Sequence, residues 1–467
     1  MGPNAAEGFL QGGGSSHVDA HRTVGFAEGL HNALPYTDIR VEPGADAGSL
    51  LPELDQDRLA GPVRLVFLDR EGREVRTEQA ARWDPTLRAI PEAAETLRLS
   101  CEIRLTEPGE HRLEVGLVGR HRVVVDGSLV SASTEEADGT AAVLDSSTTH
   151  PPGHGVSLSV GDAPVTVSVV VESQRLRSAE FGDVVRVVLR HGPPAPGAAE
   201  LLATALAAAR WAELPVLIVG TTPETESEGW DRRTLALPGD QDALAEAVLE
   251  ARPDTVVVVN AGAPVLLPWL ERARTVVWSW LPGQEAGHAL ADVLTGRTEP
   301  AGRLPWTLPA DERLVPPVTP EPDGTLPYRE GLHVGHRAYL RAGVTPAAPF
   351  GHGLGWTDWE YRDLVAGQDG VVSLTVRNTG PRHGSEVVQV YLSAPAGGPD
   401  RPVRWLAAFG RVCAGPGEQR RVTLRIPGRA LEVWDPDTGR WTTPPGDYTV
   451  HIGRSVTDVR LTGVLTR

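Results

Sequence analysis

Carboxylates are concentrated in one short stretch of the chain, E-S-E-G-W-D-R, which runs from residue 226 to residue 232. Glu226, Glu228 and Asp231 fall within six residues of one another. Because like charges at this spacing repel, at least one carboxyl group could keep its proton toward neutral pH, as a general acid requires. On composition alone, an acidic solvated loop whose last carboxylates favour the next helix N-terminus explains the same pattern. The stretch is a candidate for acid–base chemistry that needs support from the rest of the chain.

The segments on either side predict where these carboxylates lie in the fold. Residues 214–220 (L-P-V-L-I-V-G) form a continuous apolar run typical of a buried strand, and residues 243–249 have helical spacing. A loop that follows a buried strand and precedes a helix is where an α/β domain places its chemistry. We therefore expect all three acids on a strand-to-helix loop.

The chain of 467 residues exceeds what one hydrophobic core usually serves, and its pattern divides it into several parts. Residues 1–40 and 193–310 together predict an α/β domain with a parallel sheet and helical crossovers. The expected helices of this domain cover 25–33, 198–211, 243–249 and 286–294, and its strands cover 214–220, 255–260 and 274–280.

Two further parts have the short alternating strands of antiparallel β-sandwiches. Residues 48–192 form an insert, with strands expected over 97–105, 111–118, 122–125, 165–171 and 184–189. Residues 366–467 form a second sandwich, with strands expected over 371–376, 386–392, 421–426 and 448–452. The Pro- and Gly-rich residues 311–365 between them predict a wrapping linker. The expected fold is multidomain α/β plus all-β.

Composition excludes several classes of function. The 61 acidic residues outnumber the 44 basic ones and give a net charge of −17, which argues against nucleic acid or an anionic membrane as partner. Two cysteines, Cys101 and Cys413, are too few for a disulfide framework. The first residues have neither a charged nor an apolar leader segment, and the longest apolar runs are too short to span a bilayer. These observations predict a cytoplasmic protein.

The motifs and their order resemble the C-terminal two-thirds of a glycoside hydrolase family 3 β-glucosidase. The resemblance covers nearly the whole chain and includes a protective-antigen-type (PA-14-like) insert, with V-V-V-D-G at 123–127, and a fibronectin type III-like domain, with N-T-G at 378–380, E-V-V-Q-V-Y at 386–391 and G-P-G-E at 415–418. The motifs of the α/β domain and linker are G-P-N-A at 2–5, Q-G-G-G-S-S at 11–16, E-S-E-G-W-D-R at 226–232, L-P-G-D-Q at 237–241, P-G-Q-E-A-G at 282–287, G-R-L-P at 302–305, Y-R-E-G-L-H-V-G-H-R at 328–337 and P-F-G-H-G-L-G at 349–355.

The resemblance implies roles for residues of the acidic loop. Glu228 matches the family's general acid/base, and Glu226 is its rival. Trp230, Asp231 and Arg232 are candidate substrate-binding residues; alternatively, Trp230 packs beneath the sheet edge and Asp231 pairs with Arg232 to fix the loop. The chemistry of retaining enzymes needs two carboxyls about 5 Å apart, one ionised and one protonated.

No cofactor or metal is expected. His333, His336 and His352 are irregularly spaced in a Gly/Pro-rich segment without clustered acids, which disfavours a metal site. The glycines at 12–14 lack the spacing of a phosphate-binding loop.

The sequence departs from the family in one major respect. A member of the family begins with a (β/α)₈ barrel of about 250 residues that carries the nucleophilic Asp, and no barrel pattern is present. G-P-N-A normally follows an apolar strand, whereas here it follows Met1 directly. We therefore expect a truncated or split form, inactive alone, whose sheet has an unpaired edge that favours association.

Two hypotheses about function remain. The first is the acid/base-bearing portion of a retaining β-glucosidase-type hydrolase, which acts in carbohydrate catabolism on small β-glycosides. A barrel completes it, either on a longer form of the polypeptide or on a separately encoded chain. The second is a non-catalytic carbohydrate-binding or assembly subunit. The S-E-G-W-D-R loop at 227–232 favours the first, because a binding module has no need of it. Sugar preference and oligomeric state are left open.

Overall fold

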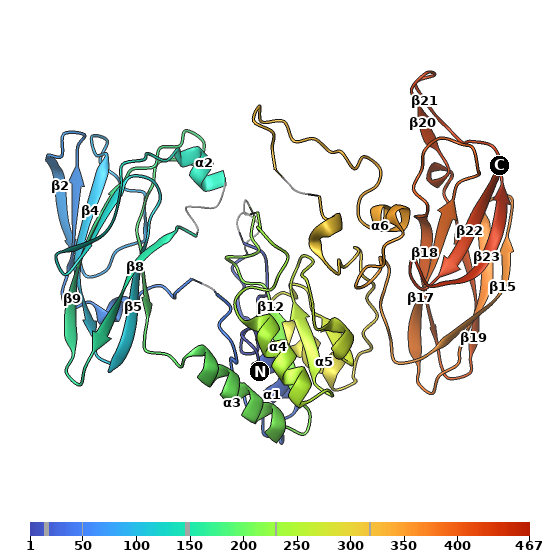
Figure 1. Ribbon diagram of the computed structural model, residues 1–467, viewed down its shortest axis with the longest axis horizontal. Coiled ribbons are helices and arrows are strands. Elements are labelled where there is room, and N and C mark those ends of the chain that lie inside the picture. Colours follow the sequence, from blue (N-terminus) through green and yellow to red (C-terminus); the bar gives the residue numbers. More distant parts are fainter. Residues whose placement is uncertain (14–17, 49, 145–149, 229–230, 317–318) are drawn as a thin grey trace.

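The structure is a computed structural model that describes residues 1–13, 18–48, 50–144, 150–228, 231–316 and 319–467. Figure 1 shows an α/β domain between two β-sandwiches, one formed by the insert and one by the C-terminal part of the chain. This arrangement confirms the predicted class, multidomain α/β plus all-β.

The α/β domain is built on a parallel sheet with the order β12-β13-β14. Its strands are β12 (Val216–Gly220), β13 (Val256–Asn260) and β14 (Thr275–Trp278). Its helices are α1 (Phe26–Ala33), α3 (Ala198–Trp211), α4 (Gln241–Ala251) and α5 (Ala286–Leu294), with a short 3-10 helix η3 (Leu270–Arg272).

Helices cover both faces of this sheet, which explains why its strands are apolar without alternation. Leu217 and Val257 point to the face packed against α3 and α4. Ile218 and Val258 point to the opposite face, against α1 and α5. On that side the backbones of α1 and α5 touch, because a Cβ on Gly29 would collide with the backbone of Gly287.

The outer edge of β12 is partly paired, contrary to the expectation of an unpaired edge. Met1 lies beside Leu217 in a parallel bridge: its amine donates to Val216 O (2.9 Å), and its carbonyl accepts from Ile218 N (2.8 Å). Farther along, the side-chain amide of Gln241 pairs with both backbone groups of Gly220, at 2.8 Å each. Burial lowers the pKa of the Met1 amine to about 6.

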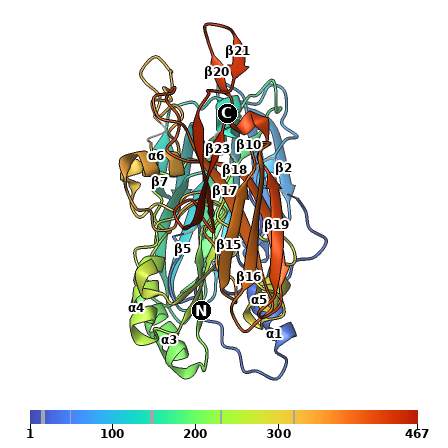
Figure 2. The same cartoon turned by 90° about the vertical axis from the view of Figure 1, so that its right-hand side faces the viewer.

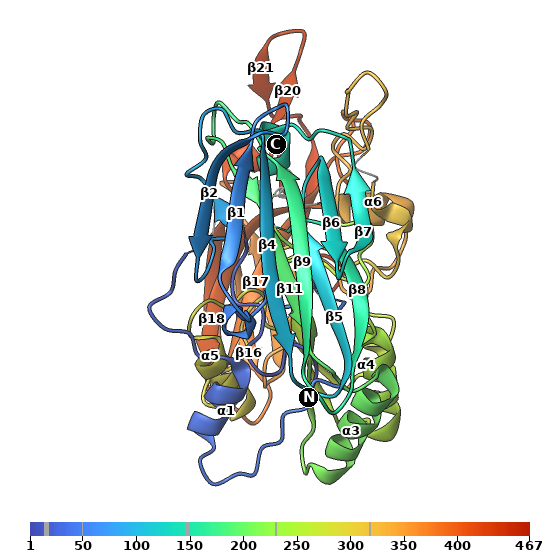
Figure 3. The same cartoon turned by 90° about the vertical axis from the view of Figure 1, so that its left-hand side faces the viewer.

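The insert is a sandwich of a six-stranded and a three-stranded antiparallel sheet around one core, with strands lined up side by side in Figure 3. The larger sheet has the order β2-β1-β4-β9-β6-β7 and the smaller β11-β5-β8. The elements are η2 (Gln56–Arg58), β1 (Val63–Leu68), β2 (Glu74–Ala80), β3 (Thr86–Leu87), β4 (Thr96–Leu105), β5 (Gly109–Gly116), β6 (His121–Val125), β7 (Ser128–Ser133), α2 (Gly139–Leu144), β8 (Gly153–Val160), β9 (Val165–Gln174), β10 (Val185–Arg186) and β11 (Val188–Gly192).

The C-terminal sandwich packs the sheet β15-β16-β19 against the sheet β18-β17-β22-β23. Figure 2 shows the hairpin β20–β21 projecting beyond one end of it. The elements are β15 (Trp359–Ala366), β16 (Val371–Asn378), β17 (Gly384–Ser393), β18 (Trp405–Ala414), β19 (Gln419–Arg425), η5 (Gly428–Ala430), β20 (Val433–Asp435), β21 (Arg440–Thr442), β22 (Asp447–Gly453) and β23 (Val459–Thr466).

The segment predicted as a wrapping linker, 311–365, contains regular structure. It includes the short helix η4 (Glu312–Leu314) and the helix α6 (His336–Ala342), and β15 begins within it at Trp359. The first strand of the C-terminal sandwich therefore starts before residue 366. Its pattern is W-E-Y-R-D-L-V-A, in which Trp359 and Tyr361 face the core.

Candidate active site

The acidic loop lies where the sequence predicted, at the carboxyl ends of the parallel strands. It leaves β12 at Gly220 and turns at once, because Thr222 O accepts hydrogen bonds from the amides of Thr225 and Glu226, at 3.0 Å each. The amide of Thr221 donates to Asn260 O at the end of β13 (3.1 Å). This tight turn directs the chain back against the sheet edge at Glu226.

Glu226 is half-buried and its carboxylate is engaged within the protein. Its Oε2 accepts hydrogen bonds from Thr221 Oγ1 (2.7 Å) and from the amide of Gly262 (3.1 Å). Gly262 lies in the loop that follows β13. The carboxylate of Glu226 thus joins the loops that leave two neighbouring strands.

Glu228 has an exposed side chain on the same loop, two residues farther along. Gly229 and Trp230 lie outside the described residues, so the prediction for Trp230 stays a prediction. Asp231 is exposed. The structure therefore places Glu226 and Glu228 in different environments, because the residue Glu226 is half-buried and the residue Glu228 is exposed.

Arg232 is held by a different partner from the one expected. Its Nη2 donates to the carbonyl oxygen of Pro264 (2.8 Å), so it fastens the loop to the segment after β13 rather than pairing with Asp231. Burial lowers the pKa of its guanidinium, an effect that the carboxylates of Glu226 and Glu312 oppose.

Asn260 is a buried residue that sequence reasoning missed. Its Oδ1 accepts from Asn4 Nδ2 (3.1 Å) and from the amide of Phe9 (2.6 Å), and its Nδ2 donates to Phe9 O (2.9 Å) and Trp280 O (2.6 Å). With an exposed fraction of 0% it ties the N-terminal segment and the loop after β14 to the sheet. The available signal was a polar residue that ends an apolar strand.

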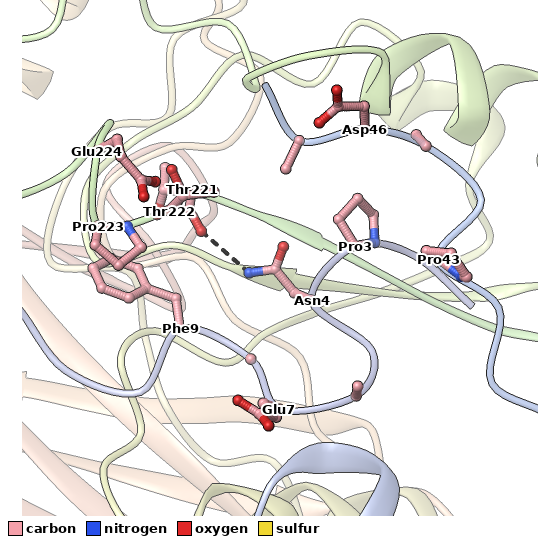
Figure 4. Close-up of a pocket in the computed structure, with 14 residues that line it drawn as sticks. Pro3, Asn4, Glu7, Phe9, Pro43, Asp46, Thr221, Thr222, Pro223 and Glu224 are labelled. Atoms are coloured by element: carbon pink, nitrogen blue, oxygen red, sulfur yellow. Dashed lines mark hydrogen bonds between the residues drawn. The ribbon is translucent and has the colours of Figure 1, made fainter. Parts of the chain in front are cut away.

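A cavity of about 560 Å³ opens beside the acidic loop (Figure 4). Three segments line it, residues 3–9, 43–47 and 221–224. Three carboxylates, Glu7, Asp46 and Glu224, share the lining with Phe9 and several prolines and alanines. Glu224 Oε2 is buried and has no hydrogen-bond partner among the described residues. A concave site with an aromatic wall and a few polar groups suits a small hydroxylated ligand.

Three tryptophans gather at the carboxyl end of β14. The ring centroid of Trp280 lies 4.5 Å from that of Trp306 and 6.1 Å from that of Trp278. Trp278 Nε1 donates to Ala261 O (2.8 Å), next to Gly262. Trp280 has φ of 58°, a left-handed conformation that a bulky residue rarely adopts. An aromatic cluster therefore lies close to the anchoring point of Glu226.

The histidines of the linker do not converge. His333 approaches Asp400 (3.3 Å), and His336 stacks on Phe350 with ring centroids 4.5 Å apart. Among the residues that the structure describes, no three His, Cys, Asp or Glu side chains gather as metal ligands. No helix in the described ranges is long and apolar enough to cross a bilayer.

Two family models match most of this chain. The model of the glycosyl hydrolase family 3 C-terminal domain matches residues 1–354, and that of the fibronectin type III-like domain matches residues 386–456. Because the first match covers more than half of the sequence, the chain belongs to glycosyl hydrolase family 3.

Its relatives include β-glucosidases that are longer than this chain. A β-glucosidase from Rhizobium radiobacter is 34% identical over 98% of this chain and 58% of its own length. A probable β-glucosidase I from Aspergillus terreus is 31% identical over 98% of this chain and 58% of its own length. The chain thus spans a little under three-fifths of the curated relatives that it matches.

Solved structures show the same architecture. A β-glucosidase from Kluyveromyces marxianus in complex with glucose superposes with a TM-score of 0.78 at 26% identity, covering 100% of this chain and 59% of its own. A β-glucosidase from Streptomyces venezuelae in complex with D-glucose superposes with a TM-score of 0.67 at 27% identity, covering 100% of this chain and 55% of its own. β-Glucosidase 3B from Thermotoga neapolitana in complex with glucose superposes with a TM-score of 0.53 at 34% identity, covering 59% of this chain and 40% of its own. The first two therefore match the insert as well as the rest.

Proposed function

We propose that this chain is the acid/base-bearing portion of a retaining β-glucosidase-type glycoside hydrolase, with Glu228 as general acid/base. The observation that carries the proposal is the contrast between the two glutamates of one loop. Glu226 uses its carboxylate inside the protein, on Thr221 and Gly262, whereas the side chain of Glu228 is exposed at the carboxyl edge of the sheet. We therefore assign the contact with the glycosidic oxygen to the exposed carboxyl of Glu228.

The proposed reaction needs a second carboxylate, the nucleophile, in addition to Glu228. In a retaining enzyme the nucleophile forms a glycosyl-enzyme intermediate while the acid protonates the leaving oxygen, and the same residue then acts as base toward water. We place the nucleophilic Asp in a (β/α)₈ barrel outside this sequence, on a longer form of the polypeptide or on a separate chain. The chain alone should then be inactive.

The proposed substrates are small β-glucosides. In support, all five relatives and solved neighbours cited above carry the name β-glucosidase, and three of them were solved with glucose. The insert, as a PA-14-like module, would cover the leaving-group side, and Trp230, Asp231 and the cavity beside Glu224 would contribute contacts there.

The test compares the chain alone with a fusion of the chain behind the barrel portion of the Rhizobium radiobacter relative (the completed enzyme). The chain alone should not hydrolyse 4-nitrophenyl β-glucoside, and the completed enzyme should. In the completed enzyme, Glu228→Gln should lower kcat/KM on an aryl glucoside with a poor leaving group by about 10²- to 10⁴-fold. On 2,4-dinitrophenyl β-glucoside, whose leaving group departs with little help from an acid, azide should attack the glycosyl-enzyme without a general base, restore turnover and yield a β-glucosyl azide.

Turnover by the pure chain would overturn the split-site proposal, and unchanged activity of Glu228→Gln would overturn the acid/base assignment. The alternative, a non-catalytic carbohydrate-binding or assembly subunit, rests on the two β-sandwiches that flank the α/β domain. It predicts binding of β-glucosides by the chain alone, measured by calorimetry, together with a completed enzyme that is no more active than the barrel by itself.

A further inference from the structure

The acid/base loop is attached to the sheet at the residues that directly precede Glu228. Glu226 binds the amide of Gly262 and the hydroxyl of Thr221 through a single oxygen, Oε2. Thr221 and Gly262 each follow the end of a neighbouring parallel strand, β12 and β13. The carboxylate therefore fixes the loop to a rigid part of the domain, two residues from the proposed acid/base.

Gly262 leaves no space for a side chain at this contact. A Cβ there would lie 2.5 Å from Glu226 Oε1 and 2.9 Å from Leu281 Cδ1, and both distances are shorter than real Cβ contacts. A larger residue would push the carboxylate of Glu226 away from the amide that it binds. The glycine thus permits the close approach on which the hydrogen bond depends.

The loop is also confined on its other side, at Ser227. A Cβ on Gly13, in the Q-G-G-G segment near the N-terminus, would lie 2.5 Å from Ser227 Oγ. Ser227 stands between Glu226 and Glu228, so the backbone of the glycine segment packs directly against the residue before the proposed acid/base. This contact gives the Q-G-G-G motif a physical role that phosphate binding does not.

We infer that Glu226 is the positioning residue for Glu228, and that Gly262 and Gly13 are the two close contacts that keep the loop in place. The inference rests on the proposed function, because it concerns how the general acid is held. An acid displaced by about 1 Å from the glycosidic oxygen loses much of its effect on rate. Removing the carboxylate of Glu226 should therefore reduce acid catalysis specifically.

The experiment measures leaving-group dependence in the completed enzyme. A 2,4-dinitrophenyl β-glucoside releases a good leaving group that needs little protonation, whereas phenyl β-glucoside needs the acid. Glu226→Ala should lower kcat/KM by about 10- to 100-fold on the phenyl glucoside and by less than about 3-fold on the dinitrophenyl glucoside. Glu226→Gln, which keeps an oxygen acceptor, should restore most of the loss, and Gly262→Ala should behave like Glu226→Ala.

The control variant is Glu250→Ala. Glu250 is an exposed residue in the last turn of α4, which leads to the amino end of β13, whereas the acidic loop lies at the carboxyl ends of the strands. This variant should leave kcat/KM unchanged on both glucosides. A parallel measurement on the chain alone follows hydrogen exchange at the amide of Gly262, which Glu226→Ala should accelerate about 10-fold or more because its acceptor is removed. This second readout does not depend on activity or on the barrel.

The outcomes separate the two proposals. If Glu228→Gln shows no selectivity between the leaving groups, the proposed function fails. If Glu228→Gln is selective but Glu226→Ala lowers kcat/KM equally on both glucosides, or on neither, the positioning role is wrong. Unchanged exchange at Gly262 in Glu226→Ala would overturn the attachment itself.

Discussion

The two β-sandwiches are attached to the α/β domain in opposite ways. The C-terminal sandwich is joined through a buried ion triad: Glu386, with an exposed side-chain fraction of 0%, meets Arg303 of the α/β domain (2.7 Å) and Arg454 (2.8 Å) of its own sandwich. Glu299 adds hydrogen bonds to the amide and hydroxyl of Ser385, at 2.8 and 3.0 Å.

The described residues of the insert show no counterpart to this interface. Within the described parts of the chain, no hydrogen bond or ion pair that the structure describes joins residues 50–192 to the rest of the protein. The carboxylate of Glu224 acts electrostatically on two residues of the insert, His150 and Arg190. Among the described residues, buried polar contacts therefore hold the C-terminal sandwich to the α/β domain, whereas the contacts of the insert with that domain are weaker.

The largest expected effect comes from removing each sandwich in turn. Replacing residues 50–192 with a Gly/Ser linker should remove the calorimetric transition of the insert. The midpoint of the transition of the α/β domain with the C-terminal sandwich should then change by less than about 2 °C, because little contact is lost. Ending the chain before Trp359 should lower the remaining transition by about 10 °C or more, because Arg303 loses its buried partner. Equal effects of the two deletions would show that the interfaces do not differ.

The buried triad itself should account for most of that difference. Glu386→Gln leaves Arg303 and Arg454 without a buried counter-charge, so we expect a loss of about 3–5 kcal/mol in the free energy of unfolding in urea. The matched control is Glu360→Gln, whose partner Arg362 is 3.7 Å away with both side chains over 40% exposed, and it should cost less than about 1 kcal/mol. The interpretation is wrong if the two variants unfold alike.

The fold was predictable for most segments that bury a regular apolar pattern, although the buried strand β1, V-R-L-V-F-L, was missed. The helices expected over 198–211 and 286–294 are α3 and α5 with the same bounds, because their small and apolar residues repeat at helical spacing. Strand β2 was missed, since most of the side chains in E-V-R-T-E-Q-A are exposed and give no alternation to detect. β15 was missed because the Pro- and Gly-rich residues before it extended the expected linker.

The site was predictable at the level of the loop but not of its contacts. The motif placed Glu226 and Glu228 together and left them as rivals. What separates them is the amide of Gly262, which lies 36 residues away in sequence and on another strand's loop. A contact made through tertiary structure leaves no local pattern, and the same holds for Arg232, whose partner is the backbone of Pro264.

A smaller effect should appear on acidification of the interface with the C-terminal sandwich. Burial lowers the pKa of His336 to about 4, with a minor contribution from Arg337, so the folded state takes up its proton later than the unfolded state, where the value is 6.5. The neutral ring should therefore contribute its full share to the free energy of unfolding above pH 6.5. About 1 kcal/mol of that free energy should be lost as the pH falls toward 4, after allowance for the partial exposure of the ring.

The variant His336→Phe keeps a ring against Phe350 and should flatten this part of the pH dependence of the unfolding midpoint. The control is His21→Phe, which changes an exposed histidine and should keep the pH dependence of the unfolding midpoint of the original chain. If His336→Phe leaves the slope between pH 6.5 and 4 unchanged, the buried ring is not the group that titrates there.

The smallest effect tests the contact between the insert and the acidic loop. Burial lowers the pKa of His150, and the carboxylate of Glu224 partly opposes that shift. Glu224→Gln removes the opposing charge, so the pKa of His150 should fall further, while the free energy of unfolding changes by less than about 0.5 kcal/mol. NMR titration of the His150 ring measures the shift. Since an electrostatic effect of this kind fades over about 8–10 Å in physiological salt, an unchanged pKa would mean that the insert does not stay beside the acidic loop in solution, and that its place above the proposed leaving-group side is not fixed by the α/β domain.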